Sequence, residues 1–298
     1  MTTIAIAGAT GGVGKTIAEL LSKNPLYRPI ILSRSKSAES LHAKVPVIAV
    51  DYNDVEGSAK LLESHAVHTV ISTIRVSSPE VALSEVNLAK ASAKSPVTKR
   101  FIASDFGSML PEPQYQLPFI QARIQAFEAL RELAPALEFT TVRCGLIADF
   151  LGMPGIASHM RPPPVVFWFD REKQTAEIPG TGNEVIAYAY SYDIARFVEA
   201  ALGLPRWDEE TTLFSGKTTF NEILGLLEKA TGSKWAVTYF DPLAKLTKSD
   251  KKFYPPDYYS LYSVQGLMNV AEDKSWNKQF PDIKTTSVEE IVGAWKGE

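Results

Sequence analysis

Short apolar runs alternate with amphipathic helical patterns through the first half of the chain. The runs are almost uninterrupted by polar residues, which is typical of parallel strands that are buried on both faces. The alternation therefore predicts an α/β fold, a doubly wound parallel sheet with helices on both sides. The expected strands are Thr3–Ala7, Pro29–Ser33, Val45–Val50, His68–Ile74, Arg100–Ala103 and Phe139–Cys144, and the expected helices are Val13–Lys23, Gly57–Ser64, Pro79–Lys94 and Pro118–Leu133.

The alternation breaks after about residue 150, where a segment rich in Gly, Pro and Met begins. We expect residues 1–150 to form one domain, to which 184–202 returns, and 151–298 to form mainly a smaller C-terminal lobe. Lys251–Tyr262 is crowded with Tyr, Pro and Lys and is not expected to form a regular core element. The elements expected in this half are strands over Val165–Phe169 and Glu184–Tyr190 and helices over Tyr192–Leu202, Thr219–Ala230 and Thr286–Trp295.

Composition and charge narrow the classes of function. Hydrophobic residues at 45% and charged residues at 22% are ordinary for a globular protein, and the formal net charge of −3 argues against nucleic-acid or membrane partners. The lone Cys144 excludes an internal disulfide, and the four histidines form no metal-binding motif, so no metal is expected. Met1–Ile6 does not resemble a signal peptide, and no apolar run approaches the about 20 residues that span a bilayer. We expect a cytoplasmic protein.

A glycine-rich segment, Gly8–Gly14 (GATGGVG), joins the first expected strand to the first expected helix. Gly8, Gly11 and Gly14 fit the pattern G-x-x-G-x-x-G, in which glycines allow a tight turn and a close approach of the backbone to phosphate. The helix N-terminus adds N–H groups and the positive end of the helix dipole. The segment therefore predicts a dinucleotide-binding site of the Rossmann type.

The same segment has a second interpretation, because it continues as Gly14-Lys15-Thr16, which is how a P-loop ends. A strict P-loop has glycine where Ala9 stands, and the loops of ParA-like ATPases have lysine where Thr10 stands. Val47–Asp51 would supply a strand that ends in a magnesium-binding aspartate. A P-loop nucleotidase is the weaker alternative.

Arg34 favours the dinucleotide interpretation. It lies 20 residues after Gly14, directly after the second expected strand. An acidic residue at this place holds the ribose 2′-hydroxyl of NAD, whereas an arginine accommodates the 2′-phosphate of NADP. A guanidinium group binds phosphate in a bidentate manner, and no Asp or Glu competes for the position. We therefore predict NADP(H) as the cofactor.

Three further motifs accompany the glycine segment and Arg34: Lys99–Gly107 (KRFIASDFG), Asp193–Arg196 (DIAR) and Phe280–Lys284 (FPDIK). With them the chain resembles the NmrA-like family, atypical relatives of short-chain dehydrogenases that include isoflavone reductases. The resemblance runs over nearly the whole chain. It implies that residues 1–150 are an NADP(H)-binding Rossmann domain and that the substrate lies between the strand ends and the C-terminal lobe.

The resemblance also implies which residues bind the cofactor. Thr10, Gly12, Val13 and Arg34 would contact the phosphates, and Asp51 would lie near the adenine. The residues that would line the rest of the cofactor are Thr73, Ile74 and Ser104, with Gly145, Leu146 and Ile147 beside the nicotinamide.

The chain departs from the family at the catalytic position. Reductases of the isoflavone type carry a lysine in a helix written Lys-x-x-Ile-Arg-Arg, and Gln121 stands at that position here. Glutamine forms hydrogen bonds but is no useful proton donor near neutral pH. The Tyr-x-x-x-Lys pair of ordinary short-chain dehydrogenases is missing as well. The remaining candidates are Arg123 for charge stabilisation and Tyr115, His159 or a buried Asp105 for proton donation.

Two functions from different classes follow. The first is an NADPH-dependent reductase of a small apolar metabolite, aromatic or heterocyclic, with hydride transfer to a polarised C=C, C=O or C=N bond. An iminium substrate would need least help from an acid, because it is already charged. The second is a redox sensor that binds NADP(H) without turnover and acts on a protein partner; a homodimer is also left open. The expected substrate contacts are Phe106, Phe150, Met153 and Trp168.

Overall fold

The computed structural model describes residues 1–35, 45–111, 118–134, 136–161, 168–248 and 255–295. Its centre is a seven-stranded sheet with the strand order β11-β6-β5-β4-β1-β2-β3. Every pairing in this sheet is parallel, as the uninterrupted apolar runs predict. The strands are β1 (Thr2–Ala7), β2 (Tyr27–Ser33), β3 (Val47–Ala49), β4 (Val67–Ser72), β5 (Arg100–Ala103), β6 (Glu138–Arg143) and β11 (Glu210–Thr212).

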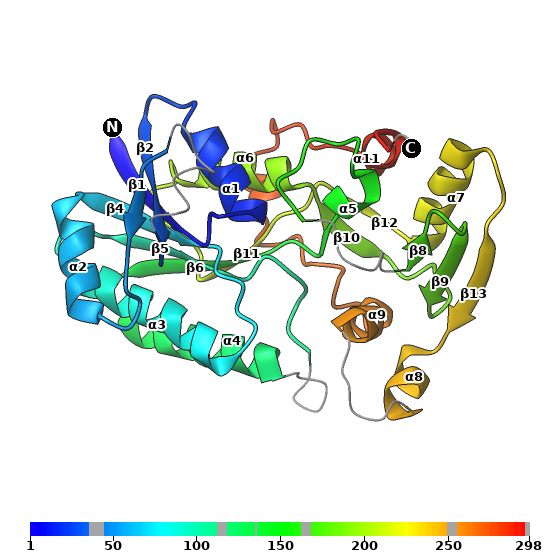
Figure 1. Ribbon diagram of the computed structural model, residues 1–298, viewed down its shortest axis with the longest axis horizontal. Coiled ribbons are helices and arrows are strands. Elements are labelled where there is room, and N and C mark those ends of the chain that lie inside the picture. The colour runs from blue at the N-terminus through cyan, green and yellow to red at the C-terminus, as the bar shows by residue number, and fades with distance from the viewer. Residues whose placement is uncertain (36–44, 112–117, 135, 162–167, 249–254, 296–298) are drawn as a thin grey trace.

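Helices cover both faces of this sheet (Figure 1). One face packs against α2 (Val55–Ser64), α3 (Pro79–Lys94) and α4 (Pro118–Leu133) through a core that includes Phe101 and Leu130. The other face packs against α1 (Gly12–Leu21), α6 (Ser191–Ala201) and α10 (Trp276–Gln279), with Ile17, Phe197 and Trp276 in a second core. The α/β, doubly wound fold class is confirmed.

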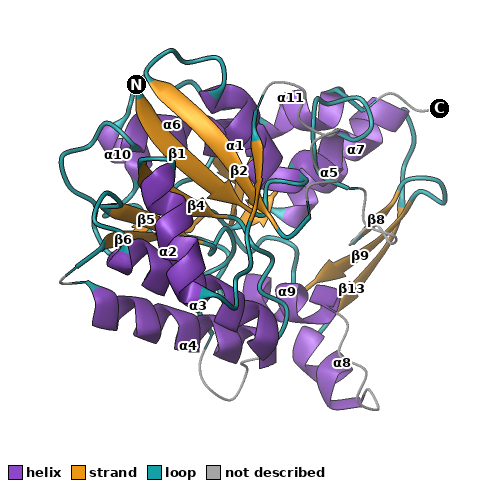
Figure 2. Ribbon diagram, turned by 60° about the vertical axis from the view of Figure 1, so that its left-hand side comes forward, coloured by secondary structure: helices purple, strands orange, loops and turns teal. Residues whose placement is uncertain are grey.

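Two small sheets and the helices around them form the rest of the molecule. The first sheet joins β7 (Leu146–Ile147), β10 (Ile186–Ala189) and β12 (Gly216–Thr218), and the second joins β8 (Phe169–Asp170), β9 (Thr175–Pro179) and β13 (Ala236–Phe240), which Figure 2 labels. The remaining helices are α5 (Asp149–Gly152), α7 (Phe220–Thr231), α8 (Pro242–Lys248), α9 (Pro255–Val264) and α11 (Val288–Gly293). None of the helices in the described ranges is long and apolar enough to cross a membrane.

Three of the differences between the structure and the sequence predictions lie in the second half of the chain. Residues 210–212 add β11 to the edge of the large sheet, although they belong to the half that was expected to form the lobe. In segment 184–202 the helix α6 packs on α1, whereas the strand β10 joins a small sheet. The third difference is α9, where a regular helix was not expected.

The helix α9 buries the aromatic residues of a segment that looked irregular in the sequence. Tyr258 and Tyr262 are four residues apart and therefore lie on the same face of the helix. Both rings are buried with Leu261 in the core of the lobe. The prediction that Lys251–Tyr262 would not form a regular core element was wrong, because prolines at the start of a helix are compatible with it and this spacing was overlooked.

Candidate active site

The glycine segment forms the turn between β1 and α1, and its glycines are required by close backbone packing. Gly8 has φ +81°, and a Cβ atom there would lie 2.5 Å from the Thr73 carbonyl oxygen. A Cβ atom on Gly14 would lie 2.2 Å from Thr73 Oγ1, whose hydroxyl donates to the Ala7 carbonyl at 2.7 Å. Thr73, which the family resemblance places on the cofactor, thus also fixes the strand β1 against the turn.

The first turn of α1 carries no capping side chain and no acidic residue, and Gly11 is its N-cap. Nothing lies within 4 Å of the place where a Gly11 Cβ would be. Thr10 beside it is exposed. Uncapped N–H groups at a helix N-terminus are the donors that phosphate uses.

Arg34 lies directly beyond the end of β2 and is exposed. The Tyr52 hydroxyl donates to the Leu32 carbonyl at 3.3 Å and thereby connects the segment after β3 to β2. Burial raises the pKa of Tyr52 to about 12, and the charge of Arg34 opposes this shift. Asp51 is exposed in the same region, where its Oδ1 accepts the Asn53 N–H at 2.9 Å. Arg34 therefore presents an exposed guanidinium group at the end of β2, the strand that pairs with β1.

Residues 153–161, which we call the strap, cross over the glycine turn. The Gly12 N–H donates to the His159 carbonyl at 2.9 Å, and Met160 Sδ lies 3.3 Å from the place of a Gly12 Cβ. His159 Nε2 also lies 2.7 Å from Glu19 Oε2 on α1. Hydrogen bonds from Lys23 and His159 are the main causes that lower the pKa of Glu19 to about 2. His159 thus holds the strap on α1, a contact that leaves little freedom for a proton donor.

A cluster of buried charges lies at the carboxyl ends of β5 and β6. Asp105 is 1% exposed, accepts a hydrogen bond from Arg143 Nε at 2.8 Å and forms an ion pair with Arg123. We call Asp105, Arg123 and Arg143 the Asp105 cluster. Two guanidinium groups favour the charged carboxylate over the acid. This environment argues against Asp105 as the proton donor that the sequence suggested.

The other catalytic candidates are dispersed. Gln121 lies in the first turns of α4 and is exposed, whereas Arg123 turns toward the Asp105 cluster and is half-buried. Burial is the largest cause of the lowered pKa of Arg123. Tyr115 lies outside the described residues.

The residues expected to line the nicotinamide lie near this cluster. Gly145 has φ +72°, and its N–H donates to the Gly107 carbonyl at 3.0 Å, which joins the turns after β5 and β6. Leu146 and Ile147 are half-buried in β7, and Ser104 and Ile74 are half-buried at the ends of β5 and β4. These positions come together at the carboxyl edge of the sheet, where ligands of open α/β sheets bind.

The expected substrate contacts are partly core residues. Trp168 donates through Nε1 to Ser260 Oγ at 2.8 Å, and its ring centre lies 4.6 Å from that of Phe220. Phe106 packs against the core on the α1 side. Phe150 and Met153 are half-buried at α5 and at the start of the strap.

Sequence reasoning missed Glu85, a fully buried acid on α3. Its Oε1 accepts the Ser104 N–H at 2.7 Å, and burial raises its pKa to about 7. A signal was present in the sequence, because Glu85 stands three residues from both Ala82 and Leu88 on the apolar face of the helix. Arg143 and its partner Glu210 were missed as well.

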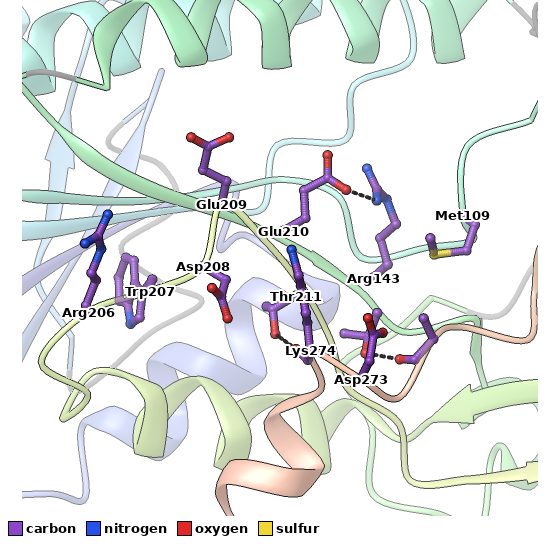
Figure 3. A pocket seen from close by; sticks show the side chains of 12 residues that line it. Met109, Arg143, Arg206, Trp207, Asp208, Glu209, Glu210, Thr211, Asp273 and Lys274 are labelled. Carbon is purple, nitrogen blue, oxygen red and sulfur yellow. Dashed lines mark hydrogen bonds and ion pairs between the residues drawn. The ribbon is translucent and has the colours of Figure 1, made fainter.

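A cavity of about 640 Å³ lies at the β11 edge of the sheet (Figure 3). Arg143 and Glu210 point toward one another in its wall, with Arg143 Nη1 and Glu210 Oε2 3.0 Å apart. The site residues that the sequence predicted are absent from its lining, so this cavity is separate from the predicted site. Arg143 connects the two, because it also binds Asp105.

A Rossmann-type sheet with an open glycine turn, an arginine after the second strand and a polar cluster at the carboxyl edge defines a nucleotide-dependent oxidoreductase of the α/β class. The chain belongs to the NmrA-like family, whose model matches residues 1–292. The predicted family is confirmed, and the P-loop alternative has no further support.

The relatives agree with this assignment. The chain is 34% identical to "Oxidoreductase BOA1" of Botryotinia fuckeliana (strain B05.10) over 79% of this chain and 78% of that one. It is 28% identical to "Oxidoreductase swnN" of Metarhizium robertsii (strain ARSEF 23 / ATCC MYA-3075) over 98% and 96% of the two chains. The prediction of an oxidoreductase is thereby confirmed.

Solved structures share the fold. Leucoanthocyanidin reductase from Vitis vinifera, in a ternary complex, superposes with a TM-score of 0.76 at 22% identity, covering 98% of both chains. A second structure of that enzyme holds NADPH. AtPrR2 with NADP⁺ and (+)pinoresinol superposes with a TM-score of 0.78 at 17% identity, covering 99% of both chains.

Proposed function

We propose that the protein is an NADPH-dependent reductase of a small apolar metabolite, aromatic or heterocyclic. The observation that carries the proposal is the N-terminus of α1, which has no capping side chain and no acidic residue in its first turn, together with the exposed Arg34 at the end of the neighbouring strand β2. Relatives that share the fold were solved with NADPH or NADP⁺, and the relatives in sequence are named oxidoreductases.

The residues fit this cofactor. The first turn of α1 offers N–H groups with no competing carboxylate, and the open side of Gly11 leaves room for a pyrophosphate. Arg34 would pair with the 2′-phosphate. Thr73, Ser104 and Gly145 would lie along the remainder. When bound, NADPH would supply a hydride to a polarised bond of the substrate.

The chain's own contribution to the reaction is electrostatic. Gln121 cannot donate a proton in place of the lysine of related reductases, and Asp105 is paired with two arginines. Arg123 would orient and polarise the substrate by its charge, without giving up a proton. The lobe residues around Phe150 and Met153 would exclude water from the apolar part of the substrate.

Thermal shift with NADPH, NADP⁺, NADH and ATP tests the cofactor assignment, since a ligand that binds only the folded state raises the melting temperature. We expect stabilisation by NADPH and NADP⁺ above NADH, and loss of that preference in Arg34→Ala. Arg206→Ala is the matched control, because it removes an exposed arginine between α6 and β11, at the other edge of the sheet. Stabilisation by ATP alone would overturn the proposal.

A sensor without turnover is the second candidate, and the exposed Gln121 at the lysine position favours it. The two candidates separate on consumption of NADPH, followed by its absorbance, with a panel of aromatic and heterocyclic carbonyl, enone and imine compounds. Consumption of NADPH with any of these compounds would identify the protein as a reductase. Tight cofactor binding with no turnover across the panel favours the sensor.

A further inference from the structure

Glu85 is a buried carboxyl group directly beneath the predicted site. It lies on α3 with 0% of its surface exposed. Oε1 accepts the N–H of Ser104, the residue that follows β5, at 2.7 Å. Oε2 has no hydrogen-bond partner of good geometry within the described ranges, although the Ser72 hydroxyl at the end of β4 interacts with the same carboxyl group. Through these two contacts, the Glu85 side chain connects α3 to the carboxyl ends of β4 and β5.

The buried charges around Glu85 do not cancel. Arg123 and Arg143 carry two positive charges against the single carboxylate of Asp105. Glu210 pairs with Arg143 from the surface, where its side chain is 43% exposed and its charge is screened. The Asp105 cluster therefore keeps an excess positive charge as long as Glu85 is neutral.

Arg123 and Arg143 share this excess charge over Asp105, and Arg123 lies beside Gly107 in the turn after β5. Its Nη2 lies 3.9 Å from the place of a Gly107 Cβ, so the missing side chain of that glycine leaves room beside the guanidinium group. The Nε atom of Arg123 is buried and has no hydrogen-bond partner within the described ranges. Arg123 thus retains an unused donor, and it shares the one buried carboxylate of Asp105 with Arg143.

Burial favours the protonated form of Glu85. Desolvation is the largest cause that raises its pKa to about 7, and the Ser104 N–H, the Ser72 hydroxyl and the charge of Arg123 oppose it. Among the described residues, the charge that acts on Glu85 is that of Arg123 on α4, and Arg123 in turn interacts with Asp105 after β5 and Arg143 on β6. Tyr259 and Tyr262 on α9 act on Arg123 from the other side.

We propose that Glu85 is a positioning residue that carries a proton in the resting site, holds the Ser104 turn, and leaves Arg123 positively charged toward the substrate. The substrate class that fits this charge is a neutral carbonyl or conjugated enone, whose oxygen gains negative charge on reduction. A cationic iminium, which the sequence alone made attractive, is disfavoured by the same charge. This assignment of substrate class depends on the proposed reductase function, whereas the protonation of Glu85 does not.

Reduction of a carbonyl needs one hydride and one proton. When bound, NADPH would supply the hydride, which forms a C–H bond at the carbonyl carbon and leaves NADP⁺. The π electron pair moves to the oxygen, which becomes an alkoxide beside Arg123. Water then supplies the proton. Ionised Glu85 would cancel the charge that stabilises this alkoxide, so the reaction would slow as the pH rises through about 7.

Protonation of Glu85 is tested by the melting temperatures of the full chain and Glu85→Gln at two pH values. Because the folded state keeps the proton that the unfolded chain loses near pH 4.5, the wild type loses stability as the pH rises from 4.5 to about 7. The amide keeps an acceptor for Ser104 but never ionises. We expect the melting temperature of Glu85→Gln relative to wild type to rise by about 4 °C between about pH 5.5 and about pH 8.5.

Glu80→Gln, on the exposed first turn of the same helix, is the control and should show no such rise. A pH-independent difference between Glu85→Gln and wild type would overturn the proposal. If Glu85→Gln does not fold, the infrared band of a protonated carboxyl group in the wild type tests the protonation of Glu85 instead. The band should be present at about pH 5.5 and lost at about pH 8.5, and its absence at both would equally contradict a resident proton.

The charge of the site is tested with two small aromatic probes, benzoate as the anion and N-methylpyridinium as the cation, measured with and without NADP⁺. We expect benzoate to bind at least about tenfold more tightly than N-methylpyridinium at about pH 6, and to weaken about tenfold by about pH 8.5. Glu85→Gln should remove this pH dependence, and Arg123→Gln should remove benzoate binding.

Tighter binding of the cation, no benzoate binding, or the same pH dependence in Glu85→Gln would each overturn the proposal. Failure of NADP⁺ to bind would instead count against the proposed function, because the benzoate measurement without cofactor still reports on the site charge.

Discussion

The glycine turn and the Asp105 cluster lie at the same edge of the sheet but are built in opposite ways. The turn consists of neighbouring residues, and its demands are steric: Gly8 and Gly14 leave room for Thr73. The cluster consists of residues from the turn after β5, from α4 and from β6, and it depends on ion pairing between buried charges. A local steric motif can be recognised in a sequence, whereas a charge cluster exists only once the chain has folded.

The cluster should be the more costly of the two to disturb. Asp105→Asn leaves Arg123 without its carboxylate partner and Arg143 with only the half-exposed Glu210, and we expect a loss of about 3–5 kcal/mol in the free energy of unfolding. Urea titration of the variant measures it. Asp208→Asn changes an exposed carboxylate at the β11 edge and serves as the control. A loss below about 1 kcal/mol for Asp105→Asn would mean that solvent already screens the cluster.

The glycine turn is tested by Gly8→Ala. The new side chain would have to adopt φ +81° and would meet the Thr73 carbonyl at 2.5 Å, so the turn must shift. We expect a loss of about 2–3 kcal/mol, together with weaker binding of NADPH, because the shift displaces the first turn of α1. Urea titration and cofactor fluorescence measure the two effects.

Gly225→Ala is the matched control for this substitution. Gly225 lies in the helix α7, it is exposed, and nothing lies within 4 Å of the place of its Cβ. Alanine there should stabilise the protein by roughly 0.5–1 kcal/mol. If both substitutions had the same sign, the steric account of the glycine turn would be wrong.

This difference between a local motif and a cluster formed on folding also explains how much of each region could be predicted from the sequence. Gly8, Gly14 and Arg34 are separated by a fixed number of residues around one strand–turn–helix, so the sequence alone predicts their arrangement. Glu210 reaches Arg143 only because β11 joins the edge of the sheet beside β6, which no local pattern indicates. Glu85 was recognisable as an acid on an apolar face, but its partner Ser104 depends on the packing of α3 against β5.

The smallest expected effect concerns the strap, which is held on α1 both by charged groups and by steric fit. Glu19 on α1 holds His159 at 2.7 Å, accepts the Tyr192 hydroxyl at 2.9 Å and pairs with Lys23. These contacts lower its pKa from 4.5 to about 2, so the stability that they add is present above about pH 5 and is lost as the pH falls toward 2. The Glu19 side chain is 32% exposed, and solvent screening therefore reduces the effect.

For Glu19→Gln we expect a loss of about 1 kcal/mol at about pH 7 that shrinks as the pH is lowered through about pH 4. Chemical denaturation at the two pH values measures it, with the exposed Glu63→Gln as the control. A loss that stayed constant with pH would show that Glu19 acts by packing and not by its charge. The strap would then be held by the bond from Gly12 to the His159 carbonyl and by Met160, that is, by the same steric fit that shapes the glycine turn.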